Sequence, residues 1–241
     1  MPAQVIKGCW QLSGGHGGDK SSDRTSGQAA VDDIGRFVGG GVTTLDTADI
    51  YGPSESLIGK YLASSLGARA DCQVLTKFCC FGDSMRQAAG AAFVERGVDG
   101  SRQRLGVGSL DLVQFYWHDY GNKNYVAAAL HLAELQAKGK IGAVGVTNFD
   151  VARLADIVDA GVAVVSNQVQ YSIMDPRPEN GMAQYCLQHG IQVGGFMVST
   201  HFSSLFWGSS VPSQAAPSGS HLGRVWLCCS CCPMARWRAA S

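Results

Sequence analysis

The sequence predicts a parallel α/β fold, a (β/α)8 barrel of the TIM type that is incomplete because strand eight and its helix are missing. Three observations point to it. Short β-prone runs alternate with longer helical patterns over residues 5–198, which is the order of repeated βαβ units. The runs are apolar almost throughout, as in parallel strands covered on both faces. After residue 198 neither pattern continues.

Each element follows from a local pattern. Pro53 stands at a first-turn position before SESLIGKYL, and Asp150 can cap VARLADIVDA. Gly139 and Gly161 provide helix stops. The expected strands are 5–10, 42–46, 73–78, 110–117, 141–146, 164–169 and 191–198. The expected helices are roughly 28–38, 53–66, 86–104, 124–138, 150–160 and 179–189.

An open, doubly wound sheet is the competing architecture, and it usually carries a glycine-rich nucleotide loop after its first strand. The segment GGHGGDK (14–20) is in that place. A GxGxxG motif would need glycine at Lys20, and a phosphate loop would need glycine at Asp19. Both motifs fail, and no Tyr-x-x-x-Lys pair of the short-chain reductases occurs. The barrel is therefore favoured.

Composition narrows the class of protein. The chain has 241 residues, 46% of them hydrophobic and 16% charged, with a formal net charge of zero. We expect no nucleic-acid partner, and no membrane partner, since no apolar run approaches the roughly 20 residues of a span. The N-terminus lacks a signal-peptide core, and nine cysteines without one indicate reduced thiols. We expect a cytoplasmic protein; its oligomeric state stays open.

Polar side chains gather at the carboxyl ends of consecutive expected strands. Asp46 ends the second strand, Tyr51 lies in the following loop, and Lys77 ends the third. His118 closes the fourth. The fifth and sixth strands add hydroxyl and amide groups at Thr147, Asn148 and Gln168. In a barrel these ends converge on one face, where catalytic groups are found.

These groups can act together on a carbonyl. A tyrosine has a pKa near 10, and an adjacent ammonium such as Lys77 lowers it. A buried Lys77 needs a counter-charge, which Asp46 provides. Tyr51 can then exchange a proton near neutral pH, and His118 can orient a carbonyl oxygen. The hydride must come from a nicotinamide, because no side chain supplies one.

Five segments carry a family resemblance. LDTADIYG (45–52), LTKF (75–78), YWHDY (116–120), GVTNF (145–149) and NQVQY (167–171) resemble the aldo-keto reductases. That family consists of (β/α)8 barrels that reduce carbonyls with NADPH or NADH. The resemblance implies that Tyr51 is the proton donor, that Asp46 and Lys77 tune it, and that His118 orients the substrate. It covers residues 5 to about 198.

The same resemblance implies a cofactor site. Thr147, Asn148 and Gln168 would hold the nicotinamide carboxamide, and Gly8 and Trp10 in KGCWQL would lie beside the nicotinamide. NADPH is the expected cofactor, with NADH possible, and a small-molecule carbonyl compound is the expected substrate. The family also has an aromatic ring after strand seven that stacks on the nicotinamide. Phe196 is either that ring or part of a GGFL-type segment just beyond it, which would remove the ring.

The tail departs from the family. We expect a partial barrel over 1–198 and an irregular or disordered tail over 199–241, rich in Ser, Gly, Pro and Cys. Without strand eight, strands one and seven would have open edges, and the usual phosphate loops would be lost. CCSCC (228–232) is too compact for one tetrahedral zinc site, so we expect no metal. A truncated, non-catalytic protein, at most nucleotide-binding or regulatory, is therefore the alternative to an enzyme.

Overall fold

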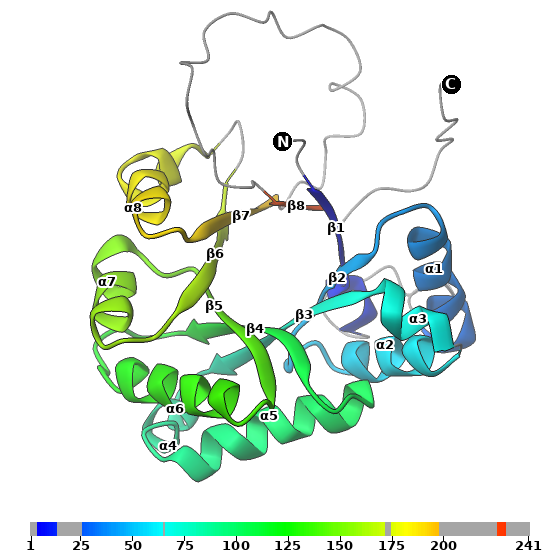
Figure 1. The fold of residues 1–241 in the computed structure, drawn as a ribbon, viewed down its shortest axis with the longest axis horizontal. Helices are drawn as coiled ribbons and strands as arrows, with labels where there is room; N and C mark the ends of the chain where they lie inside the picture. Colours follow the sequence, from blue (N-terminus) through cyan, green and yellow to red (C-terminus); the bar gives the residue numbers. More distant parts are fainter. Residues whose placement is uncertain (1–3, 14–25, 65, 172–174, 198–225, 230–241) are drawn as a thin grey trace, which may run out of the picture.

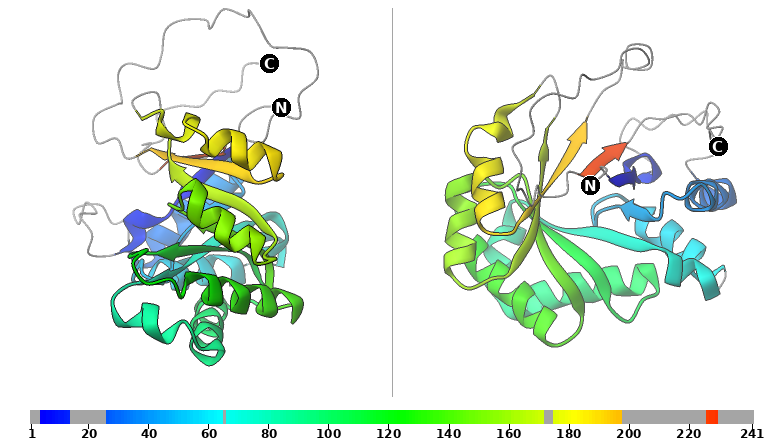
Figure 2. Two further views of the ribbon diagram at one scale, coloured as in Figure 1. Left: turned by 90° about the vertical axis from the view of Figure 1, so that its left-hand side faces the viewer. Right: turned by 45° about the horizontal axis from the view of Figure 1, so that its top comes forward.

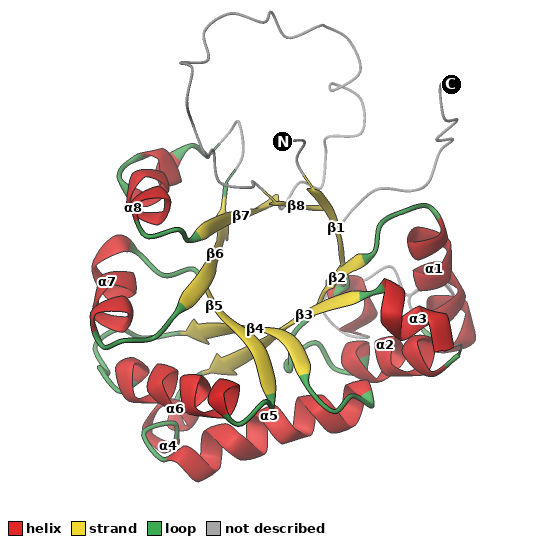
Figure 3. Ribbon diagram, in the orientation of Figure 1, coloured by secondary structure: helices red, strands yellow, loops and turns green. Residues whose placement is uncertain are grey.

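The computed structural model describes residues 4–13, 26–64, 66–171, 175–197 and 226–229. In these residues eight parallel strands close into one barrel in sequence order, with helices on its outside (Figures 1 and 3). The strands are β1 (Gln4–Gly8), β2 (Thr44–Asp46), β3 (Gln73–Cys80), β4 (Leu110–Trp117), β5 (Ile141–Thr147), β6 (Val164–Gln170), β7 (Gln192–Met197) and β8 (Trp226–Cys229).

The helices follow the expected order with two changes. They are η1 (Trp10–Ser13), α1 (Gly27–Gly39), α2 (Ser54–Ala63), α3 (Leu66–Asp71), α4 (Asp83–Gln87), α5 (Ala91–Leu105), α6 (Tyr125–Ala137), α7 (Val151–Asp159), η3 (Arg177–Glu179) and α8 (Met182–Gln188). The single helix expected over 86–104 is two, because Gly90 takes an extended conformation before α5. The helix expected over 53–66 ends at Ala63, and α3 follows it.

The expected helix signals take effect in the structure. The Asp150 side chain accepts a hydrogen bond from the Arg153 backbone N–H at 2.9 Å, which caps α7. Gly139 and Gly161 have φ of 75° and 96°, a left-handed conformation that glycine adopts without strain. Both follow the ends of helices, as the sequence predicts.

The (β/α)8 class is confirmed, and no helix follows α8 in the described part of the chain. One detail of the expectation is wrong: Trp226–Cys229 of the tail forms a short β8 that pairs in parallel with β7 and β1. The right-hand view of Figure 2 shows β8, in red, beside β7. Strands one and seven therefore have no open edge along these four residues, and this part of the tail is not irregular.

Strand alternation divides the barrel into two apolar regions. On β4, Val113, Phe115 and Trp117 point outward into the layer shared with the helices. Leu112 points inward, where it packs with Ile6 of β1 and Leu75 of β3 in the lumen. Side chains two residues apart share a face, so the inward face of β3 and β4 continues from this apolar floor toward the carboxyl ends of the strands. That end carries the polar residues predicted from the sequence.

No helix in the described residues is long and apolar enough to cross a lipid bilayer.

Candidate active site

A buried ion pair lies at the carboxyl end of the lumen. The Lys77 Nζ is 2.8 Å from both carboxylate oxygens of Asp46 and donates a third hydrogen bond, 3.0 Å, to the Thr47 carbonyl. The two side chains are only 8% and 7% exposed. Low exposure makes each charge depend on the other, because neither is solvated by bulk water. The pairing expected for Asp46 and Lys77 is therefore present.

Two amides complete the shell of Asp46. Gln114 of β4 donates to Oδ1 at 2.8 Å, and Gln168 of β6 donates to the same oxygen at 3.1 Å. Gln114 is a functional candidate that the sequence analysis missed, because it lies inside an apolar run. Gln114 is two residues from Leu112, and residues two apart on a strand share a face. This spacing could have predicted that Gln114 points into the lumen.

Tyr51 lies in the loop between β2 and α2. The Lys77 Nζ is 5.5 Å from the centroid of its ring, within cation–π range. The loop is fixed by a hydrogen bond of 3.1 Å from the Tyr51 N–H to the Ala48 carbonyl and by one of 3.0 Å from the Ser54 N–H to the Tyr51 carbonyl. The structure thus brings together three of the four expected catalytic residues.

His118 lies on the rim of the barrel. It follows the last residue of β4, and it is exposed. Its Nδ1 is 3.2 Å from the Tyr116 hydroxyl, and its ring is 5.2 Å from that of Phe81. These contacts place His118 beside Tyr116 and Phe81 at the end of β4.

The expected carboxamide-binding residues adjoin one another. Thr147 ends β5, and its hydroxyl donates to the Gln168 backbone carbonyl at 3.0 Å. The Asn148 N–H donates to the same carbonyl at 2.8 Å. Asn148 has φ of 61°, a left-handed conformation in which a short polar side chain is tolerated. Two amides and a hydroxyl therefore lie on neighbouring strand ends.

The remaining expected residues lie on the strands around this group. Gly8 ends β1 and pairs in register with Asp46, and Trp10 begins η1 with 39% of its surface exposed. Phe196 is on β7, where its backbone pairs with Gln170 and Cys228. The side chain of Phe196 lies outside the described residues, so both alignments of this residue stay predictions.

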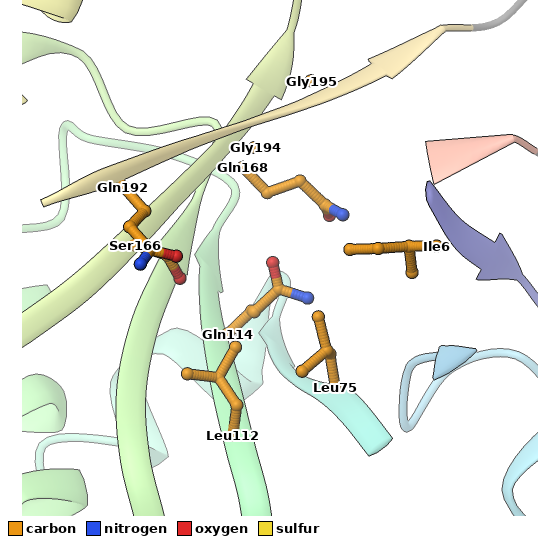
Figure 4. A pocket seen from close by; sticks show the side chains of 9 residues that line it. All are labelled: Ile6, Leu75, Leu112, Gln114, Ser166, Gln168, Gln192, Gly194 and Gly195. Atoms are coloured by element: carbon orange, nitrogen blue, oxygen red, sulfur yellow. The ribbon is translucent and has the colours of Figure 1, made fainter. Parts of the chain in front are cut away.

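A small cavity extends into the lumen beneath Asp46, and Figure 4 shows the side chains around it. Its lining includes the two glutamines that bind Asp46 and the apolar floor of Ile6 and Leu75. The Ser166 Oγ is buried without a hydrogen-bond partner in the described part of the chain. The residues that line the cavity are Ile6, Leu75, Leu112, Gln114, Ser166, Gln168, Gln192, Gly194 and Gly195.

The thiols near the site are poor nucleophiles. Burial raises the pKa of Cys9 and of Cys80 to about 12, and it raises the pKa of Cys79 further. Each therefore keeps its proton at neutral pH, while only a thiolate attacks an electrophile. Cys9, Cys72, Cys79, Cys80 and Cys186 are free thiols. The chemistry of the site is left to Tyr51 and its charged neighbours.

Asp49 is a second buried carboxylate, two residues before Tyr51. The Cys79 N–H donates to its Oδ2 at 3.1 Å, and its Oδ1 is buried without a hydrogen-bond partner among the described residues. Burial raises the pKa of this carboxyl to about 6, against 3.8 ordinarily, although the hydrogen bonds from Cys79 oppose the shift. Above pH 6 its charge therefore destabilises the folded state, and the penalty disappears as pH falls toward 4.

Asp49→Asn is accordingly expected to stabilise the protein at pH 8, by on the order of 2 kcal/mol since one pKa unit corresponds to about 1.4 kcal/mol. The gain should shrink as pH approaches 4. Urea unfolding from pH 4 to 8 measures it, with the exposed Asp159→Asn as the control that stays flat. A difference between Asp49→Asn and wild type that is constant with pH would contradict the shifted pKa.

Comparison with known proteins identifies what this arrangement resembles. A model of the Aldo/keto reductase family matches residues 4–203. Over 234 residues the chain is 25% identical to the NADH-specific methylglyoxal reductase of Escherichia coli, covering 91% of this chain and 70% of that protein. Over 140 residues it is 32% identical to an aldo-keto reductase of Mycolicibacterium smegmatis, covering 58% and 48%. The chain thus spans seven tenths of one relative and about half of the other.

Solved structures give the same fold. A thermostable aldo-keto reductase in complex with the inhibitor epalrestat superposes with a TM-score of 0.69 at 24% identity, covering 83% of this chain and 72% of that one. An aldo/keto reductase from Klebsiella pneumoniae in complex with NADP and acetate gives a TM-score of 0.65 at 23% identity, covering 80% and 62%.

Proposed function

The chain belongs to the aldo/keto reductase family, and we propose that it reduces aldehydes or ketones to alcohols, with NADPH or NADH as the hydride donor. One observation carries the proposal: the buried Asp46–Lys77 pair lies directly beside the Tyr51 ring at the carboxyl end of the barrel. This is the arrangement in which a phenol can give up a proton near neutral pH.

Each residue has a defined role in the proposed reaction. Tyr51 donates its hydroxyl proton to the carbonyl oxygen as hydride reaches the carbonyl carbon. The Lys77 ammonium then stabilises the phenolate, and Asp46 keeps that ammonium in place. The end of β4, where His118 and Tyr116 are hydrogen-bonded, orients the carbonyl oxygen. Solvent returns the proton to Tyr51 after the alcohol leaves.

The donor set fits a nicotinamide. Its carboxamide has one acceptor and one donor end, and the amides of Asn148 and Gln168 offer both on adjoining strand ends. The Gln168 amide is held in place by the hydrogen bond of 3.1 Å that it donates to Asp46 Oδ1. When bound, the cofactor supplies a hydride. The segments that follow β7 and β8 lie outside the described residues, so the choice between NADPH and NADH is left to the assay below.

Consumption of NADPH and NADH with a panel of small aldehydes tests the proposal. Methylglyoxal belongs in the panel because the Escherichia coli relative is named for it. We expect carbonyl-dependent oxidation of at least one cofactor by the wild-type chain. A folded chain that oxidises neither cofactor with any carbonyl contradicts the catalytic proposal.

A non-catalytic, nucleotide-binding protein is the second candidate. The observation that favours it is the short β8, which has four residues. It predicts cofactor binding, seen as quenching of tryptophan fluorescence, together with no carbonyl-dependent turnover. A thermal melt recorded by circular dichroism on the same sample shows whether the chain is folded.

A further inference from the structure

The position of Tyr116 on β4 places it in the lumen face of the site. Leu112 and Gln114 precede it on the same face, and Gln114 reaches Asp46. In register, Gln114 pairs with Lys77, and Tyr116 pairs with Cys79 one step further on. An advance of two residues along a strand is about 6.5 Å. Tyr116 therefore lies one layer above the ion pair, toward the mouth of the barrel.

The other neighbour of Tyr116 belongs to the expected cofactor site. On its second side, Tyr116 pairs in register with Thr147 of β5. The strand position of Tyr116 is thus between β3, which carries Lys77, and β5, which ends in Thr147. A group that orients the carbonyl oxygen is needed between these two positions.

His118 lies two residues beyond Tyr116 in the chain. It is exposed beyond the end of β4, and its Nδ1 is 3.2 Å from the Tyr116 hydroxyl. Phe81 holds the pair, since its ring centroid is 5.2 Å from each of the two rings. Tyr116 itself is only half-buried, so its hydroxyl is accessible to a ligand in the mouth of the barrel.

We propose that Tyr116 is a catalytic residue whose hydroxyl donates a hydrogen bond to the substrate carbonyl oxygen, and that His118 is a positioning residue that acts through it. In the productive arrangement the His118 Nδ1–H donates to the Tyr116 oxygen, which turns the hydroxyl proton toward the substrate. No proton is transferred along this chain of donors, because Tyr51 supplies it. The inference rests on the proposed reductase function.

The protonation of Tyr116 agrees with this role. Burial, and secondarily the neighbouring Cys79, raises the pKa of Tyr116 above its ordinary value. The phenol therefore keeps its proton at neutral pH and serves as a donor. Tyr51 lies beside the Lys77 ammonium, so in this arrangement Tyr116 donates a hydrogen bond and Tyr51 donates the proton.

A double-mutant cycle tests the arrangement. Loss of one hydrogen-bond donor to a developing oxyanion lowers kcat by about 100-fold or more in sites shielded from water. Tyr116→Phe keeps the ring against Phe81 and removes only the hydroxyl. Because Tyr116 is only half-buried, we expect this substitution to lower kcat by about 10- to 100-fold. His118→Ala should lower kcat by a smaller factor, and His118→Asn, whose amide can donate from a similar place, should restore much of it. In the Tyr116→Phe background, His118→Ala should have no further effect. Cofactor affinity should be unchanged throughout.

The contrary outcomes are distinct. If His118→Ala lowers kcat equally in both backgrounds, or more than Tyr116→Phe does, His118 contacts the substrate itself and the inference is wrong. If Tyr116→Phe leaves kcat unchanged while Tyr51→Phe removes it, the inference fails and the proposed function stands. A folded wild-type chain without turnover overturns both.

Discussion

Tyr51→Phe should lower kcat for carbonyl reduction by about 100- to 10,000-fold, because a positioned general acid accelerates a reaction by factors in this range. Phenylalanine keeps the ring beside Lys77 and removes only the hydroxyl. The loss should therefore fall on kcat, while cofactor binding stays near the wild-type value. Steady-state kinetics and a fluorescence titration with NADPH measure the two quantities.

Tyr61→Phe is the matched control. It removes a half-buried hydroxyl from α2 that contacts Cys72, just before the amino end of β3, and should leave kcat within a factor of two or three. Residual turnover by Tyr51→Phe above one tenth of the wild-type rate would mean that another group donates the proton. Tyr116 would then be the first candidate, since it is a protonated phenol on the same face.

The Asp46–Lys77 pair should show the second large effect, on both activity and stability. Removing one partner of a buried ion pair costs about 3–5 kcal/mol of unfolding free energy, because the other charge is left buried. Lys77→Met and Asp46→Asn should each approach that loss, and each should abolish turnover. Urea denaturation and the aldehyde assay on the same samples measure the two consequences.

The double variant separates stability from chemistry. Asp46→Asn with Lys77→Met removes both charges, so its loss of unfolding free energy should be smaller than the sum of the two single losses, whereas activity stays absent. Arg86→Met serves as the control, because Arg86 and Asp83 form a pair that is 73% and 78% exposed. Such a pair contributes less than about 1 kcal/mol. Additive losses from Asp46 and Lys77 would show that the two charges do not depend on each other.

The sequence alone predicts those site residues that are polar and stand at the end of an otherwise apolar strand. Asp46 and Lys77 stand out at the ends of short β-prone runs, and their pairing follows from charge and from the convergence of strand ends. Gln114 does not stand out, because its role depends on which face of β4 points into the lumen. The residues of β4 are apolar on both faces, so the sequence does not show which face that is. The bounds of β4, by contrast, agree with the expected strand over 110–117.

Strand β8 could not be predicted for a different reason. WLCC is four residues long and has no turn or helix signal of its own. Its pairing depends on the backbone groups that β1 and β7 present on either side, which is information from the closed barrel. The local sequence pattern predicts long elements well. A short strand that closes a barrel depends instead on the unpaired backbone groups of the two strands beside it, with which it forms hydrogen bonds.

Transfer of deuterium tests the chemistry of the Asp46–Lys77–Tyr51 site most directly. With NADPH or NADH deuterated at the transferable position, the wild-type chain should give an alcohol that carries one deuterium on the former carbonyl carbon, seen by mass spectrometry. Tyr51→Phe should give none above background over the same time. An unlabelled product from wild type, or equal labelling by the two proteins, would contradict hydride transfer coupled to proton donation by Tyr51.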